Sequence, residues 1–559
     1  MRAYPVCAAV VSLLCAASAS IALDLNYAGE FTRIPSHGPG AAAPAMAAQR
    51  AVHVRLRSQL YGTALSGNAA RSYRSEDWQY ANVVSATYRH PFASAERQLQ
   101  LTANLRNTQD RRLQQDAVEL TGWMLDYGHG PAHRLQAGDI ALHGQRHVCQ
   151  RSLLGASYQG ATAVAGGDGR GYAGYGRLEQ AVEGVQYRRM LLASGVAWTR
   201  SLQQRLVRAL SLEAGYANAR DDAGSIDDHA GLVPLTNHVF GVGLGLAAGR
   251  GTRLRADLAI SRLVDQDTDA SSEDHAWSAE LDQVFAAGAL RLGWEEVQPD
   301  FRSLSGSGNP DTRRLHSQLS WRVGRRLNLG AGLVRYQSGH AAAELTTTTP
   351  SAQAVVQPCA ARPGSSALQQ LRLALRLSRP AYESGAGAVD RSTLHHLWSL
   401  SSVAGAWEMG LTYAGQSTRD EVNAANDRAR DNIGLTLQHP RLLSLPNVQG
   451  SLSIALDRDA DGLEAAADRN VRSRLAARSA GTLGPLQYAC GASLDDADLA
   501  AGQDYQRVSW DASVSRQLGG PHELLVGAAI DGRHRRSAAA GTQGDLGEIT
   551  ARVQMQASF

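Results

Sequence analysis

The last residues of the chain alternate strictly between apolar and polar side chains. The apolar positions are Ile549, Ala551, Val553, Met555, Ala557 and Phe559, and a polar residue stands between each pair. Because side chains alternate faces along a strand, one face of this segment is wholly apolar and the other wholly polar. The segment is also as long as a tilted strand must be to cross a bilayer. It therefore predicts a membrane-crossing strand, although an edge strand of a soluble sandwich has the same pattern.

A final strand of this pattern that ends in Phe559 resembles the C-terminal signature of bacterial outer-membrane β-barrels. The resemblance implies that the barrel-assembly machinery reads Phe559 as its assembly signal. It also implies a place in the cell outer membrane of a Gram-negative bacterium, in contact with lipid and lipopolysaccharide.

The front of the chain predicts export. Residues 1–22 combine the basic Arg2, a short apolar stretch and small residues near Ala22, as in a secretory signal peptide. We expect residues 23–50 to be a loose periplasmic lead segment and residues 51–559 to be the barrel. No other apolar stretch approaches the length of a transmembrane helix, so a membrane protein with this sequence has to be a closed barrel.

Alternating segments recur along the whole mature chain. Examples are residues 99–105, 240–246, 254–260, 315–323, 371–377, 407–413 and 508–514. They predict an all-β fold, a transmembrane antiparallel up-and-down barrel of about 22–26 strands, with an even number expected. Long and short connections alternate, except between Gln337 and Arg391, where a further strand near 352–358 would restore the rhythm. Residues 108–188 are poorly phased, and Ala341–Ser366 is our candidate for a loop folded into the lumen.

Arginines occupy many polar positions of these segments. A lipid-facing Arg costs about 2–4 kcal/mol at the bilayer midplane, so we expect these side chains to line the lumen. Rings of Arg attract anions, but acidic residues share the same rows, which favours a mixed, ion-paired, water-filled interior over a dedicated anion filter. The predicted lumen-lining residues are Arg55, Arg57, Arg106, Arg255, Arg291, Arg322, Arg372, Arg376 and Arg552.

One predicted loop carries a calcium-like pattern. Asp457, Asp459 and Asp461 precede Gly462, and Asp468 stands at the twelfth place. Alternate carboxylates can converge on one hard cation where a Gly allows a sharp turn. Ca2+ at an extracellular loop is thus the metal hypothesis, against the simpler interpretation of an ordinary acidic loop; we expect no other cofactor.

Enzyme signatures are missing from the sequence. His316 stands beside Ser317, and His395-His396 precede Ser399, but there is no G-x-S-x-G or H-E-x-x-H motif. We therefore predict that the protein is not an enzyme. Residues 135–139 (LQAGD), followed by residues 152–158 (SLLGASY), resemble a strand pair in the barrels of fimbrial ushers.

Together these patterns predict an outer-membrane channel, porin-like or an export pore, for hydrophilic or charged cargo such as polysaccharide. Periplasmic export components are the partners such a pore would need. The net charge of +3 is too small to indicate a nucleic-acid partner. The alternatives are an outer-membrane hydrolase, an esterase or protease, and a non-conducting scaffold or adhesin.

Overall fold

The computed structural model describes residues 51–558 with gaps. The gaps are 68–77, 93, 95, 109–117, 183–184, 203, 205, 227–230, 340–343, 359–370, 386, 405, 440–447, 462–468, 499–504, 519–522 and 538–545. The predicted signal peptide, the lead segment and Phe559 lie outside the described residues. Within them, no helix is long and apolar enough to cross a membrane.

Strands make up nearly all of the described chain. They are β1 (Ala51–Gly67), β2 (Gln79–Pro91), β3 (Arg97–Thr108), β4 (Val118–His129), β5 (His133–His143), β6 (Gln150–Val164), β7 (Gly167–Val182), β8 (Val185–Ser201), β9 (Val207–Asp221), β10 (Leu235–Ala248), β11 (Thr252–Asp265), β12 (Ser271–Phe285), β13 (Gly288–Val297), β14 (Thr312–Val323), β15 (Leu327–Ser338), β16 (Leu345–Val356), β17 (Arg372–Ser378), β18 (Ala381–Ser384), β19 (Asp390–Ala404), β20 (Trp407–Asp420), β21 (Arg428–His439), β22 (Val448–Asp461), β23 (Arg469–Leu483), β24 (Leu486–Asp498), β25 (Tyr505–Leu518), β26 (Glu523–Ser537) and β27 (Leu546–Ser558). Two single-turn 3-10 helices, η2 (Ala223–Ser225) and η5 (Ala424–Asn426), lie in connections.

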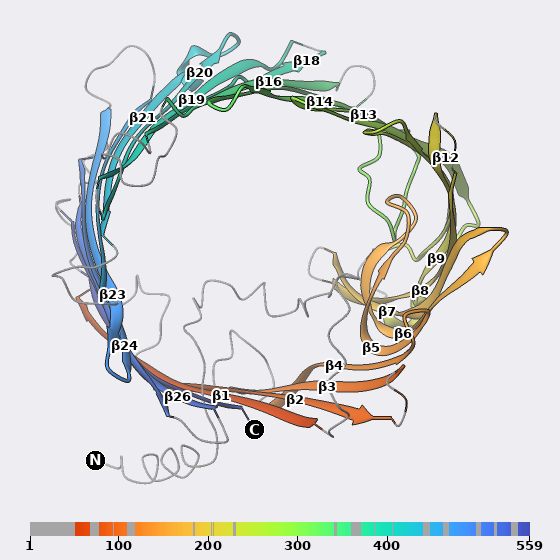
Figure 1. Cartoon of the computed structure of the whole chain (residues 1–559), viewed down its shortest axis with the longest axis horizontal. Coiled ribbons are helices and arrows are strands. Elements are labelled where there is room, and N and C mark those ends of the chain that lie inside the picture. Colours follow the sequence, from red (N-terminus) through yellow and green to blue (C-terminus); the bar gives the residue numbers. More distant parts are fainter. Residues whose placement is uncertain are drawn as a thin grey trace.

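The strands form one closed antiparallel barrel (Figure 1). Apart from β17 and β18, each strand pairs with the next along the chain, and β1 pairs with β27 to complete the ring. β17 and β18 both lie between β16 and β19, so the 27 strands fill 26 positions in the wall. The break between them falls at Pro380, which has no N–H to donate to a ladder. The predicted fold class is confirmed, with the strand number at the top of the expected range.

The two faces of the wall can be told apart by following the register. The turn between β5 and β6 lies inside the ring (Figure 1), where it packs in one cluster with Ala217, Val239 and Ala259. Residues directly opposite each other in an antiparallel ladder share a face, so the register carries this inward row from strand to strand around the barrel. The opposite row carries exposed apolar side chains such as Phe240 and Val242. The barrel therefore has an apolar outer surface, as a protein of the outer membrane requires.

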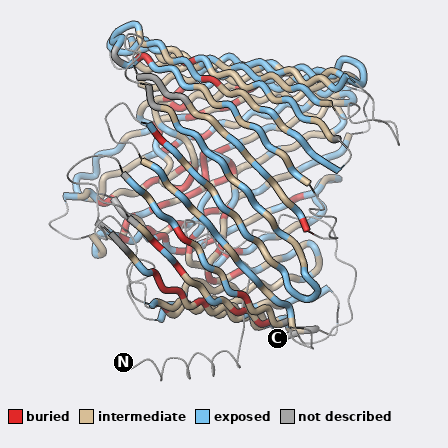
Figure 2. Tube along the Cα trace, turned by 90° about the vertical axis from the view of Figure 1, so that its left-hand side faces the viewer, coloured by how far each residue is buried: buried red, intermediate tan, exposed pale blue. Residues whose placement is uncertain are grey.

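The connections sort by length onto the two ends of the barrel. One end carries tight links such as residues 165–166, 286–287 and 484–485, and the other carries longer ones such as residues 222–234 and 298–311. The strands cross the wall obliquely (Figure 2). An exception is the link of residues 357–371, a long connection at the tight end, which lies where the sequence rhythm breaks.

Two sequence interpretations need correction here. Ala341–Ser366 is not an inward loop, because Leu345–Val356 within it forms β16 and pairs with β15 and β17. The further strand expected near 352–358 is therefore real, and it begins earlier than predicted. The segment was missed because it is rich in Thr and has few large apolar residues. Such a segment can still form a wall strand, because half of its side chains face water.

Candidate functional site in the barrel lumen

A hairpin leaves the wall and enters the lumen at Gly138. β5 pairs with β4 only from His133 to Gly138, whereas its pairing with β6 continues to His143. Gly138 has φ +101, and a Cβ there would lie 2.1 Å from the carbonyl oxygen of Trp123. Only Gly fits such a bend. The freed N–H of Trp123 donates to the Asp139 carboxylate at 2.7 Å, so the bend leaves no orphan donor.

The hairpin is held against the wall by an apolar core. Leu142, Val148 and Cys149 are fully or almost fully buried and join a cluster with inward-facing residues of the wall. Those wall residues are Leu191, Ala193, Ala217, Ala219, Val239, Ala259, Ala276 and Val297, from β8 to β13. Burial raises the pKa of the Cys149 thiol in the turn to about 11, so this free cysteine is a neutral packing group.

Small residues make room for the hairpin. A Cβ at Gly241 would lie 2.3 Å from Oε1 of Gln145 and 2.5 Å from Cγ2 of Val148. A Cβ at Gly174 would lie 2.5 Å from Leu142. Both glycines stand on the inward row, so the hairpin packs directly on the backbone of the wall. We call this region, the inner face of β7–β13 with the hairpin on it, the covered arc.

A strap, residues 298–311 between β13 and β14, crosses the covered arc and holds the hairpin tip. The Ser305 hydroxyl donates to the Val148 carbonyl at 2.6 Å, and the Gln150 N–H donates to the Ser305 carbonyl at 2.8 Å. On the wall side, Nδ2 of Asn237 donates to the Arg302 carbonyl at 3.0 Å. Phe301 of the strap is fully buried, and its ring meets His147 edge-on.

His147 in the turn is a buried ionisable group at this junction. Its Nδ1 lies 2.8 Å from the Ser307 carbonyl, which fixes the proton on that nitrogen, and Nε2 faces Oε1 of Glu295 at 3.6 Å. Glu295 also pairs with Arg146 at 3.0 Å. Desolvation by burial is the main influence and lowers the pKa of His147, so the neutral imidazole is the form that docks best.

Several luminal arginines of β23–β27 are ion-paired. Arg507 lies 2.8 Å and Arg474 lies 3.3 Å from Asp495. Arg552 lies 2.9 Å from Asp531. These pairs follow β23–β27, and they match the mixed interior that the sequence favoured.

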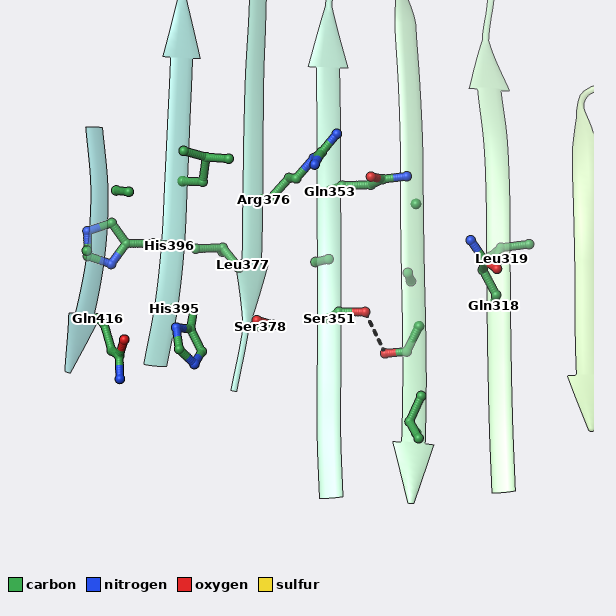
Figure 3. A pocket seen from close by; sticks show the side chains of 18 of the residues that line it. Gln318, Leu319, Ser351, Gln353, Arg376, Leu377, Ser378, His395, His396 and Gln416 are labelled. Atoms are coloured by element: carbon green, nitrogen blue, oxygen red, sulfur yellow. Dashed lines mark hydrogen bonds between the residues drawn. The ribbon is translucent and has the colours of Figure 1, made fainter. Parts of the chain in front are cut away.

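The inner face of β13–β21 is different, and we call it the open arc. It lines a shallow cavity of about 970 Å³ between the strands, shown in Figure 3. Arg376, Gln353, Ser351 and His395 stand side by side there on neighbouring strands. Apart from the Arg146–Glu295 contact with the hairpin, the inward ion pairs of this arc in the part of the chain that the structure describes are Arg291–Asp282 at 2.6 Å and the loose Arg430–Asp457 at 3.9 Å.

The nine predicted lumen-lining arginines all stand on the inward row. Arg255 pairs with Glu213 and Asp257, at 2.9 and 2.8 Å. The others are on six further strands: Arg55, Arg57, Arg106, Arg291, Arg322, Arg372, Arg376 and Arg552. They do not form a ring at one height; they are distributed around the whole wall.

The predicted calcium loop has a different conformation. Asp457, Asp459 and Asp461 belong to β22, which is extended and paired on both sides, and Asp468 lies outside the described residues. The backbone of this segment is therefore a strand and not the turn that a calcium loop of this type needs. Asp457 instead accepts a hydrogen bond from Asn432. The described residues contain no cluster of metal-ligating side chains.

The histidines considered for catalysis are separated from one another. His395 faces the lumen opposite Ser378, whereas His396 stands on the outward row beside Tyr413. Sequence reasoning missed the hairpin and the strap. The LQAGD segment is the bend itself, and the inward glycines of β10 were visible, but a glycine row does not say what covers it.

No protein-family model matches the sequence, and no curated protein does. Among solved structures, the chain is similar to the Escherichia coli P pilus tip assembly intermediate PapC-PapD-PapK-PapG, with a TM-score of 0.50 and 12% identity. That match covers 86% of this chain and 64% of the other chain, so the chain spans less than two thirds of its length. A second match, to the P pilus usher (PapC) translocation pore, has a TM-score of 0.41 and 10% identity over 91% of this chain and 99% of that chain. Such identities establish the fold alone, a large outer-membrane barrel.

Proposed function

We propose that the protein is an outer-membrane channel that passes hydrophilic or charged cargo, with a lumen partly filled by its own hairpin and strap. The observation that carries this proposal is the wall itself: a closed ring with an apolar outer row and a polar, ion-paired inner row. A barrel of this size is wide enough to hold an aqueous channel, and side chains alone do not fill it.

Conductance tests the proposal. We expect the purified full chain, reconstituted in planar lipid bilayers, to give stepwise currents that persist at low voltage. Insertion without current at any voltage would instead indicate a scaffold or adhesin. Hydrolysis of a lipid or peptide by the purified protein, abolished by substituting one His, would favour the hydrolase.

A second candidate is passage of a polypeptide. It is favoured by the inward hairpin, which falls at the segment whose sequence resembles an usher strand pair, and by the similarity to a P pilus assembly intermediate. The two candidates differ in what they need: small solutes cross alone, whereas a polypeptide needs periplasmic components that deliver it. Co-purification with periplasmic proteins of the same cell, lost when the hairpin is substituted, would favour the second.

A further inference from the structure

Positive charge is concentrated in one arc of the lumen. Between Thr312 and Trp407 the sequence has eleven Arg and only three acidic residues, Glu344, Glu383 and Asp390. Glu383 and Asp390 pair with each other on the outward row, and Glu344 precedes β16. The inward row from β14 to β19 therefore has no carboxylate, although the rest of the chain is net acidic.

One row of direct cross-strand partners crosses this arc. It runs from Arg291 on β13 through Gln318, Ser351, Ser378 and His395 to Arg430 on β21. Every member is polar or Gly, and an Arg stands at each end. The row lines the cavity of about 970 Å³ along its whole length.

The next inward row contains Arg376, directly opposite Gln353 (Figure 3). Arg376 is exposed, and the inward ion pairs of this arc in the described residues do not include it. A guanidinium that no carboxylate of the wall neutralises is a ready partner for an anion from outside, which it can bind through two parallel hydrogen bonds.

The groups between the arginines suit hydroxyls. The amides of Gln318, Gln353 and Gln416 each offer donors and an acceptor, and Ser351 and Ser378 add hydroxyls. A ligand with both carboxylates and many hydroxyl groups would satisfy both kinds of side chain.

The row also runs partly along the height of the barrel wall. Neighbouring strands lie about 4.8 Å apart and tilt by roughly 40°, so a row perpendicular to them climbs the wall by about 20 Å over these strands. A single small anion would use one point of such a row. An extended chain of sugar units would use its length.

We propose that the open arc is a binding track for an acidic oligosaccharide, with carboxylates on Arg376 and Arg430 and sugar hydroxyls on the Gln and Ser side chains of the two inward rows that line the cavity. The inference rests on the proposed channel function and names the chemical class of its cargo. Recognition by the wall is a separate property from conduction, so the two can be measured separately.

Calorimetric titration of the detergent-solubilised full chain with trigalacturonate, at low salt, tests the track directly. We expect saturable binding, no detectable binding of the neutral maltotriose, and weakening of at least tenfold in R376Q/R430Q. The matched control is R478Q/R552Q, which removes the same charge from β23 and β27, outside the open arc, and should change the affinity less than twofold. Heat-modifiable migration in gels confirms that each variant forms the barrel.

The outcomes separate the hypotheses. Tripolyphosphate that binds as tightly as trigalacturonate, with the same dependence on Arg376 and Arg430, would overturn the sugar part of the proposal. Equal weakening in both double variants would show a general charge effect and overturn the track. Binding as predicted by a protein that gives no current would keep the track and reject the channel.

Discussion

The covered arc and the open arc are two parts of one wall with the same outer face. Both carry exposed apolar side chains outside, such as Val242 on β10 and Leu400 on β19. Inside, the covered arc has Gly and Ala beneath a packed hairpin, whereas the open arc has Arg, Gln, His and Ser facing a cavity. The bilayer therefore sets the outer row everywhere, and the inner row is free to follow what the lumen holds in each place.

The largest expected effect comes from placing a charge beneath the hairpin. Val148 is fully buried, so an uncompensated carboxylate in V148D should cost on the order of 3–5 kcal/mol of docking. We expect the hairpin and strap to be released while the barrel stays closed. Single-channel conductance should then rise. Once the hairpin is released, trypsin should also cut after Arg146, an exposed residue of its turn.

The matched control places the same charge on the inner face of β25, outside both arcs. S513D adds a carboxylate to an exposed luminal position and should leave both the conductance step and the trypsin pattern close to those of the original protein. Conductance and protection unchanged in V148D would mean that the hairpin core does not close the lumen.

A smaller effect should follow from overfilling the glycine floor. G241L forces atoms into the space held by Gln145 and Val148, and overpacking of this kind costs about 1–3 kcal/mol. We expect faster trypsin cleavage of the hairpin than in the original protein and slower cleavage than in V148D. In the open arc, a Cβ at Gly410 would lie 2.6 Å from Oγ1 of Thr436, a residue of the wall and not of the hairpin, so G410L should leave trypsin cleavage of the hairpin unchanged. Equal sensitivity of the two variants would argue against close packing in the covered arc.

The sequence could predict the outer row but not the contents of the lumen. The alternation at residues 254–260 and 508–514 follows from the bilayer, which leaves polar side chains one face only. The hairpin depends on pairs far apart in the chain, such as Ser305 with Val148, which no local pattern encodes. Inward glycines at 241, 243 and 245 keep the alternation intact and hide the partner that they accommodate.

The predicted site residues divide in the same way, into what the sequence could predict and what it could not. The arginines could be placed on the inward row because a lipid-facing Arg is too costly, but which of them are neutralised depends on cross-strand neighbours. Arg552 meets Asp531, whereas Arg376 meets Gln353. The calcium interpretation of Asp457–Asp461 stays a prediction, because β22 continues through the acidic segment and Asp468 lies outside the described residues.

Lowering the pH should weaken the docking of the hairpin in the covered arc, by less than V148D or G241L does. Burial lowers the pKa of His147 in the docked hairpin, so the released hairpin binds more protons. Docking is therefore most favourable above the ordinary His pKa of about 6.5 and weakens as the pH falls below it. Trypsin cleavage at Arg146 should be faster near pH 5.5 than at pH 8, after correction for the pH dependence of trypsin itself.

The charged groups around His147 allow a control. Glu295 from β13 and Asp257 from β11 favour the imidazolium, and Arg146 in the turn opposes it. H147Q removes the titrating group and should flatten the pH dependence of cleavage. A pH dependence that persists in H147Q would assign the acid sensitivity to another group.

The smallest effect belongs to the ion pairs that face water across from the covered arc. Arg552 and Asp531 lie 2.9 Å apart with side-chain exposures of 22% and 33%, so water screens the pair. A double-mutant cycle of R552Q and D531N, followed by urea unfolding in detergent, should give a coupling energy of about 0.2–1 kcal/mol. A coupling as large as the penalty expected for V148D would mean that this side of the lumen is packed and dry, and the contrast between the two arcs would then be lost. A small coupling would instead show that water surrounds this ion pair and that the pair contributes little to the stability of the barrel wall.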